Sequence, residues 1–458
     1  MCTSDRCQSK NKCEIGEELW PILVLLKCLG NCPLVKRRIE TKSISTSCPC
    51  DSERNQASAS AIVYQFYSTI SLEAIFQVML NFIYITASIL YVGNVVLQKS
   101  FIATSLQANK TFPSFIRPQN DSDCINGYNA SQIELLDFLF GKVEALLYQL
   151  VTTMELVSSW WTAKDFARFV NNWQFFRQKY EQQFNPSYNN AWHNIVLNLR
   201  HFKKKLLIIY TTIPVLFFIP VFALSHANDS HWINIIVLIA STMQLIPRSL
   251  LEDAKMLLSY KILQSYFIEI QNDIAVVVER DKGKVQAETI KAWGDILDYI
   301  RTQSILLLKT QSTMQLTLVA FSTVSTTIFI FVAVNSKAIE NDENKIYFLC
   351  MAVGYPVFFI TRLYVKIISA EKLTTEEQNL GLFLSNQNFG LDQSDIPAQI
   401  KVSGIISRIR HSPVEISFGN YVTLNKQLLL KILGQILTYI IVLMQVQTNF
   451  AGRCKFSL

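Results

Sequence analysis

The segment QLLLKILGQILTYIIVLMQVQ, residues 427–447, decides the fold. It is long enough to cross a bilayer as a helix, which takes about 20 mostly apolar residues. Its polar residues are ordered, because Lys431, Thr438 and Gln445 are seven residues apart and share one helical face, which Gln435 flanks. A polar stripe along an apolar helix predicts a membrane segment that faces water.

The composition of the whole chain agrees with a membrane protein. Of its 458 residues, 50% are hydrophobic and only 17% are charged, whereas soluble domains carry about 25% charged residues. These values exclude a soluble globular protein and a disordered one. The net charge of +7 does not indicate a nucleic-acid partner, because most basic residues lie in loops beside apolar stretches, where they set topology.

Seven apolar stretches are long enough to span the bilayer, so the sequence predicts an all-α membrane protein with seven transmembrane helices. The transmembrane domain covers residues 61–447. Residues 1–60 form an N-terminal tail, in which the apolar stretch 19–35 is too short and too interrupted to span and is expected to be an interfacial helix. The predicted spans are 64–97, 133–160, 205–225, 231–258, 312–335, 346–369 and 427–447.

Two features predict a cytoplasmic N-terminus and an extracellular C-terminal tail, residues 448–458. The basic clusters 36–38 and 203–205 lie beside spans on the side that this orientation places inside. All four usable N-glycosylation sequons fall in segments that it places outside. The sequons are those of Asn109, Asn120, Asn129 and Asn228, the extracellular loop is 98–132, and the cytoplasmic anchor segments are 161–204, 259–311 and 370–426.

The outer halves of the spans supply polar and aromatic side chains for a water-filled ligand pocket. In the second span, Asp137, Gly141, Glu144, Tyr148 and Glu155 share one face, and ionisable groups within a membrane usually face a cavity or a partner. A structural salt bridge explains this stripe equally well. Aromatic rings with hydroxyl and amide groups suit a small organic ligand. The other candidates for the pocket wall are Trp232, Thr242, Gln244, Ser322, Ser325, Phe329, Tyr347 and Tyr355.

The last span has the pattern of a pore lining if several copies surround an axis. A ring of Gln445 amides would offer hydrogen bonds to partly hydrated ions, with Thr438 on the same face. Val442 and Val446 would form an apolar constriction that closes the pore by dewetting. In the alternative interpretation, the Thr438 hydroxyl bonds back to its own helix and Gln445 bridges to a neighbouring helix.

No pattern indicates an enzyme, a metal centre or a bound cofactor. The ten cysteines and five histidines lack metal-ligand spacing, and neither a glycine-rich phosphate loop nor a nucleophile elbow occurs. The cysteines before residue 51 are expected to be reduced in the cytoplasm. On the outside, Cys124 and Cys454 either pair or stay free.

The end of the chain resembles a known receptor family. Thr438-Tyr439, five apolar residues and Gln445 are similar to the TYhhhhhQF signature of insect gustatory receptors, with Val446 where phenylalanine is usual. The Leu-rich approach to this helix and LWPILVLLKCLGNCPL at 19–34 also resemble that family.

The resemblance implies a tastant-gated, non-selective cation channel in the plasma membrane of sensory neurons. It implies a homo- or hetero-tetramer with other gustatory receptors, no G protein, and a central pore lined by the last helix with Gln445 and Val446 at the gate. It also implies that helices two to six form the tastant pocket, open to the outside.

The ligand class and one other mechanism stay open at this point. An acidic stripe with aromatic rings suits a basic, bitter compound, and a sugar would use the same groups. The chain does not closely resemble the sugar receptors of the family, which favours a bitter or other small organic ligand. A secondary transporter is the alternative from another class, motivated by Asp137 and Glu144 within the membrane, but no internal repeat supports it. If cations pass the pore, Lys426 and Lys431 at its inner end need acidic partners or a sideways exit for the ions.

Overall fold

The computed structural model describes the helical core of the chain and parts of its N-terminal region. The predicted extracellular loop, the four sequons, most of the first span, Asp137 and Gly141 lie outside the described residues. The described residues are 15–28, 32, 34–41, 59–66, 79, 82, 86, 144–184, 188–213, 232–282, 285–335, 345–387, 389, 396–419 and 421–455.

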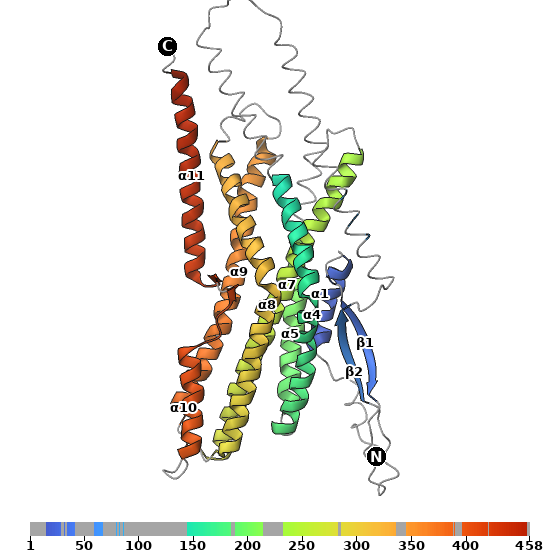
Figure 1. Cartoon of the computed structure of the whole chain (residues 1–458), viewed down its shortest axis with the longest axis vertical. Coiled ribbons are helices and arrows are strands. Elements are labelled where there is room, and N and C mark those ends of the chain that lie inside the picture. Colours follow the sequence, from blue (N-terminus) through green and yellow to red (C-terminus); the bar gives the residue numbers. More distant parts are fainter. Residues whose placement is uncertain are drawn as a thin grey trace, which may run out of the picture.

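Five long helices run side by side along the long axis of the molecule (Figure 1). The four longest of them contain 41, 42, 49 and 49 residues. Forty residues of α-helix extend about 60 Å, twice the thickness of the hydrocarbon core. Each helix therefore joins a predicted span to much of a predicted anchor segment without interruption. The five helices are α4 (Glu144–Phe184), α5 (Tyr188–Ile213), α7 (Trp232–Arg280), α8 (Ala287–Asn335) and α9 (Lys345–Asn386).

The core of the described structure is richest in the half of the bundle that the sequence assigns to the cytoplasm. Trp173 of α4 stacks on Tyr266 of α7 with ring centroids 4.5 Å apart and planes 3° apart. Phe176 packs edge-on against Tyr266 and stacks on Tyr299 of α8, so that one aromatic cluster joins three helices. Burying such large rings supplies much of the stabilisation of a helical core.

The N-terminal region differs from the prediction of a single interfacial helix over 19–35. Helix α1 covers Ile15–Cys28, and strand β1 (Leu34–Thr41) pairs antiparallel with β2 (Ala59–Phe66). Of the stretch 19–35, residues 19–28 belong to α1 and residues 34 and 35 belong to β1. The sequence between them contains Gly30, Asn31 and Pro33, which are residue types that disfavour a helix. Residues 64–66, which the sequence assigns to the first span, belong to β2.

Side-chain contacts attach this N-terminal region to the bundle. The Asn171 side-chain amide of α4 donates to the Tyr64 carbonyl at 2.8 Å, and its oxygen accepts from the Tyr64 N–H at 2.9 Å. Glu18 of α1, which is 4% exposed, pairs with Arg200 and Lys203 of α5. Lys203, the first residue of the basic cluster that flanks a predicted span, therefore also holds α1 in place.

The C-terminal elements form a hairpin-linked pair of helices. Helix α10 (Ile396–His411) packs on α8 and α9, and a short hairpin of β3 (Ser417–Phe418) and β4 (Val422–Thr423) leads into α11 (Lys426–Lys455). Gly419 has φ of +59°, a conformation that glycine adopts without strain, and it allows the tight turn between the strands. Helix α11 runs along the edge of the bundle, beside α8 and α9 (Figure 1).

Two of the described helices are apolar and long enough to cross a membrane on length and composition alone. They are Ala287–Phe331 within α8 and Lys426–Gln445 within α11. Half of the most apolar stretch of α8 is buried, as in any core helix, but only 11% of that of α11 is. The described part of the chain therefore leaves most of the apolar surface of α11 uncovered.

Candidate functional site

The polar stripe of α11 faces away from the subunit to which the helix belongs. Ile436 and Ile440 are 4% and 7% exposed and mark the face that packs on the bundle. Successive residues turn by about 100° around a helix, which places Lys431, Thr438 and Gln445 on the opposite side. All three side chains are exposed. The stripe that the sequence predicts is thus available to an aqueous space or to other subunits.

Local hydrogen bonds order part of this stripe. The Thr438 hydroxyl donates to the Gly434 carbonyl at 2.9 Å, as the alternative interpretation of the sequence expected. Gln435 Nε2 donates to the Tyr439 hydroxyl at 2.8 Å. A back-bonded threonine still presents oxygen lone pairs outward, so Thr438 remains able to accept a hydrogen bond from water. Val442 is exposed beside the stripe, and the side chain of Val446 lies outside the described structure.

The residues predicted to form the ligand pocket are distributed over helix ends that meet at one end of the bundle. Helices α4, α7 and α9 begin, and α8 ends, at the upper end of Figure 1. The described structure shows three of the side chains. Ser325 and Phe329 are each 2% exposed and Ser322 donates to the Leu318 carbonyl at 2.7 Å, so these three side chains are mostly packed inside their own subunit. The side chains of Glu144, Tyr148, Trp232, Thr242, Gln244, Tyr347 and Tyr355 are outside the described structure.

A second group of charged residues, which the sequence did not single out, is buried along the same helices, farther from the end of the bundle than the predicted ligand pocket. Asp253 of α7 pairs with both Arg362 and Lys366 of α9, the latter at 2.6 Å. Arg362 also donates to the Ser249 carbonyl at 2.9 Å. Lys366 donates to Gln315 of α8 at 2.8 Å. One carboxylate thus pairs with two cations that lie one turn apart on a neighbouring helix.

Glu155 of α4 extends this group to a fourth helix. Its carboxylate lies 3.9 Å from Arg248 of α7, and both side chains are at most 1% exposed. For Glu155 the structure therefore supports the salt-bridge interpretation of the stripe in the second span. We call the set Glu155, Arg248, Asp253, Gln315, Arg362 and Lys366 the polar layer.

The polar layer lies at one level of the bundle, which is informative about topology. Each of its residues falls near the end of a predicted span that the N-inside orientation places at the cytoplasmic boundary. Helices that alternate in direction must bring these ends together, as the ion pairs do. The signal was present in the sequence, because buried ionisable groups within spans are costly and are kept for a role or a partner.

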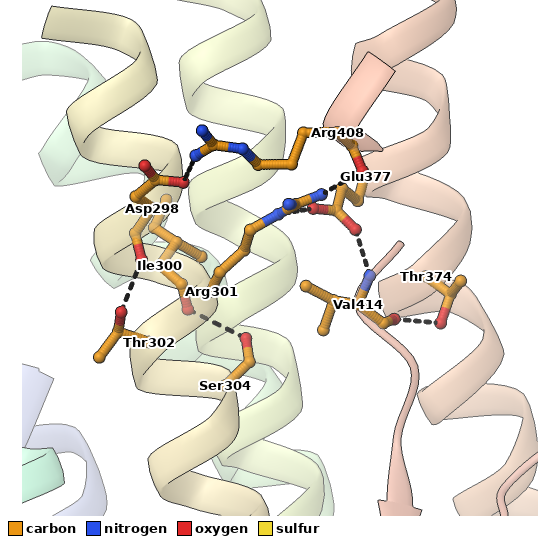
Figure 2. Close-up of polar contacts among 9 residues, drawn as sticks. All are labelled: Asp298, Ile300, Arg301, Thr302, Ser304, Thr374, Glu377, Arg408 and Val414. Carbon is orange, nitrogen blue, oxygen red and sulfur yellow. Dashed lines mark hydrogen bonds and ion pairs between the residues drawn. The ribbon is translucent and has the colours of Figure 1, made fainter. Parts of the chain in front are cut away.

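Below the polar layer, polar contacts fix the segment that leads from α10 to α11. Glu377 of α9 is fully buried, and its carboxylate binds Arg301 of α8 at 2.6 Å and accepts from the Val414 N–H (Figure 2). Thr374, one turn earlier, donates to the Val414 carbonyl at 2.8 Å. Arg301 also donates to the Arg408 carbonyl at the end of α10. Burial raises the pKa of the Glu377 carboxyl, and the Val414 N–H and Arg301 partly offset that effect.

A cavity of about 720 Å³ borders this network. Arg301 and Lys309 provide its positive charge, but Glu377 already pairs with the first and Asp165 with the second. Both cations of the lining are therefore already paired, and Glu415 adds a carboxylate. It lies along α8 and the α10–α11 connection, far along the bundle from the predicted outer pocket, and its lining includes Ser304, Leu308, Ser312, His411, Val414 and Glu415.

Comparison with known proteins identifies the family. The 7tm Chemosensory receptor family matches residues 129–450, which is more than half of the chain, and the chain therefore belongs to that family, which includes the insect gustatory and olfactory receptors. Membership confirms the expectation of a multi-pass membrane receptor that is not an enzyme. Comparison with curated proteins finds no significant match.

Solved structures confirm the all-α, seven-transmembrane fold. The chain is similar to the insect olfactory receptor OR5 from Machilis hrabei in complex with eugenol, with a TM-score of 0.60 and 12% identity over 94% of this chain and 98% of that one. It is also similar to a second structure of the insect olfactory receptor OR5 from Machilis hrabei, with a TM-score of 0.56 and 13% identity over the same shares. At this identity the likeness concerns the fold.

Proposed function

We propose that the chain is a gustatory receptor that works as a tastant-gated, non-selective cation channel. One observation carries the proposal: the polar stripe of α11 points away from its own subunit, while only 11% of the most apolar stretch of that helix is buried. A membrane helix with one polar face and an uncovered apolar surface is satisfied when several copies enclose an aqueous axis. We further propose that four copies do so, with Gln445, Val442 and Val446 at the constriction.

The charge at the inner end of α11 is compatible with cation flow. Glu371 of α9 accepts from Lys426 Nζ at 2.9 Å, which offsets one of the two lysines that opposed a cation pathway. The fixed carboxylate is held at the mouth of the proposed pore. Lys431 is exposed on the stripe, where its charge lies at the end of a long flexible stem.

The ligand is proposed to enter from outside, at the end of the bundle where α4, α7 and α9 begin. We propose a bitter or other small organic tastant. A sugar is kept as the alternative, because the acidic and aromatic residues expected there suit either class of ligand. The olfactory receptor with the similar fold was solved with eugenol, an aromatic small molecule, which supports a small organic ligand.

The test is electrical recording from cells that express the chain, with a panel of bitter compounds and sugars. Gln445→Ala should change conductance or cation selectivity while surface expression stays normal. Met444→Ala, at the neighbouring and also exposed position off the stripe, is the matched control and should leave both unchanged. Unchanged permeation in Gln445→Ala would contradict the pore assignment, and saturable uptake without channel currents would favour a transporter.

The orientation is proposed to be N-terminus inside, with glycans on the outside. Removal of the sequons one at a time, by Asn109→Gln, Asn120→Gln, Asn129→Gln and Asn228→Gln, should reduce the apparent mass of glycosylated protein at each site in use. Glycan-free protein whose loop 98–132 is reached only from the cytosol would contradict this orientation.

A further inference from the structure

Helix α9 holds the start of α11 through three polar residues, each three positions after the last. Glu371, Thr374 and Glu377 lie on one face of α9 and bind the connection to α11 at both of its ends. We call these three residues the α9 clamp. Their position below the polar layer means that one continuous helix passes from the predicted outer pocket, through the ion pairs of Arg362 and Lys366, to the clamp.

Glu371 completes the N-terminus of α11. One carboxylate oxygen accepts from the Lys426 backbone N–H at 2.8 Å and the other from Lys426 Nζ at 2.9 Å. Asn425 caps the same end by accepting from the Leu428 N–H at 2.9 Å. The first turn of α11 contains no acidic residue of its own. A helix N-terminus carries unsatisfied N–H groups and a partial positive charge, and here a carboxylate from another helix stabilises both.

Thr374 and Glu377 hold the other end of the connection. They bind the carbonyl and the N–H of Val414, so that both backbone polar groups of this residue are fixed to α9 (Figure 2). Glu377 is fully buried, and Arg301 ties it to α8. The connection is therefore anchored at Val414 and at Lys426, with only the β3–β4 hairpin between the two points.

We propose that the α9 clamp positions the pore helix, and that displacement of α9 reaches α11 through Glu371. The inference rests on the proposed function, because it takes α11 as the pore lining. A rigid helix fixed to a second helix at its first residue must carry that residue when it moves, whereas the following turns of α11 pack on the bundle through apolar side chains such as Leu428, Leu429 and Ile432. Glu371 is thus a positioning residue that does not contact the permeating ion.

A charge-reversal cycle tests the link. Glu371→Lys and Lys426→Glu each place like charges at the contact, and each should shift the half-maximal tastant concentration by about 2- to 30-fold. The double variant restores the side-chain ion pair and the net charge at the pore mouth, but not the hydrogen bond to the Lys426 backbone N–H. It should therefore recover part of that shift, with cation permeability ratios as in the wild type. The swap of the exposed pair Asp298→Arg with Arg408→Asp is the control and should have no such effect on gating. A double variant no better than the worse single variant would overturn the proposal.

A second measurement does not depend on a pore. Hydrogen–deuterium exchange of the purified receptor should show faster exchange in residues 426–430 for Glu371→Gln than for the wild type, with the bundle helices unchanged. Glu376→Gln, at a neighbouring position on α9 outside the clamp, is the matched control. Unchanged exchange would refute the clamp itself, whereas faster exchange with unaltered permeation in Gln445→Ala would leave the clamp standing and refute the pore.

Discussion

Lys366 of α9 lies with its ammonium nitrogen 2.6 Å from a carboxylate oxygen of Asp253 on α7, and both side chains are buried. Because Arg362 binds the same carboxylate, both ion pairs between these two helices share a single negative charge. Desolvation of three charged groups is repaid only while all of them remain paired.

Replacing Asp253 by asparagine should therefore strongly destabilise the folded protein. Two buried cations lose their counter-charge, and removing one partner of a buried ion pair costs about 3–5 kcal/mol. Thermal unfolding of the detergent-solubilised protein measures the loss. Asp298→Asn removes one side of an exposed pair and should change stability by less than about 1 kcal/mol. Equal melting temperatures for the two variants would mean that the polar layer is not a structural element.

The stacked pair Trp173 and Tyr266 should dominate the stability of the half of the bundle that the sequence assigns to the cytoplasm. Trp173→Ala removes a side chain that is 1% exposed and leaves a cavity, which costs about 3–5 kcal/mol. Trp161 of the same helix is 84% exposed, so Trp161→Ala is a control of identical chemistry. Size-exclusion chromatography of a fluorescent-protein fusion after heating should show a larger loss of folded receptor for Trp173→Ala than for Trp161→Ala. Similar losses for the two variants would argue against the aromatic cluster as the core.

Docking of α1 should depend on Glu18 rather than on its neighbour Glu17. Glu18→Gln takes away the charge that Arg200 and Lys203 surround, whereas the Glu17 pair with Lys36 is partly exposed. We expect faster proteolysis and faster hydrogen exchange in residues 15–28 for Glu18→Gln only. An equal response of Glu17→Gln would indicate that general charge, and not the buried contact, retains the helix.

Stability should also vary with pH through Asp273 of α7. Burial raises the pKa of this carboxyl to about 6, and its Oδ2 atom has no hydrogen-bond partner among the described residues. The native state then binds a proton more tightly than the unfolded state does, so this group lowers stability as pH rises from about 4 through 6. Asp273→Asn should raise the melting temperature at pH 7.5 by about 1–3 °C and have less effect at pH 5.

One outcome would contradict a raised pKa for the Asp273 carboxyl. A stabilisation by Asp273→Asn that is larger at pH 5 than at pH 7.5 has the wrong sign for a carboxyl with a raised pKa. Asp281→Asn is a suitable control, because Arg280 lowers the pKa of the exposed Asp281 carboxyl instead.

The sequence predicted those parts of the molecule that follow a local period. The spacing of Lys431, Thr438 and Gln445 predicted a polar face on α11, and the face is where the spacing placed it, because an exposed helix keeps its own geometry. The long apolar stretches predicted the all-α membrane fold for a similar reason. Strand β1 was missed, because its residues follow a glycine, an asparagine and a proline that were read only as interruptions of a helix.

The pairing of distant charges was beyond sequence reasoning. Asp253 and Lys366 are more than a hundred residues apart, and only the packing of α7 on α9 decides that they meet. The lysines of α11 were expected to need acidic partners, but periodicity alone could not identify Glu371 as the partner of Lys426. The choice follows from the hairpin that returns the chain to α9 just before Lys426.

The central claim is that the polar stripe of α11 faces an aqueous conduit shared by several subunits, and cysteine accessibility tests it most directly. Gln445→Cys and Met444→Cys receptors are exposed to a charged methanethiosulfonate reagent while tastant-evoked current is recorded. The account predicts that current through Gln445→Cys falls and stays low after washout, whereas Met444→Cys and the wild type are unaffected. Block of Met444→Cys with Gln445→Cys spared would place the wrong face of α11 in the conduit and contradict the account.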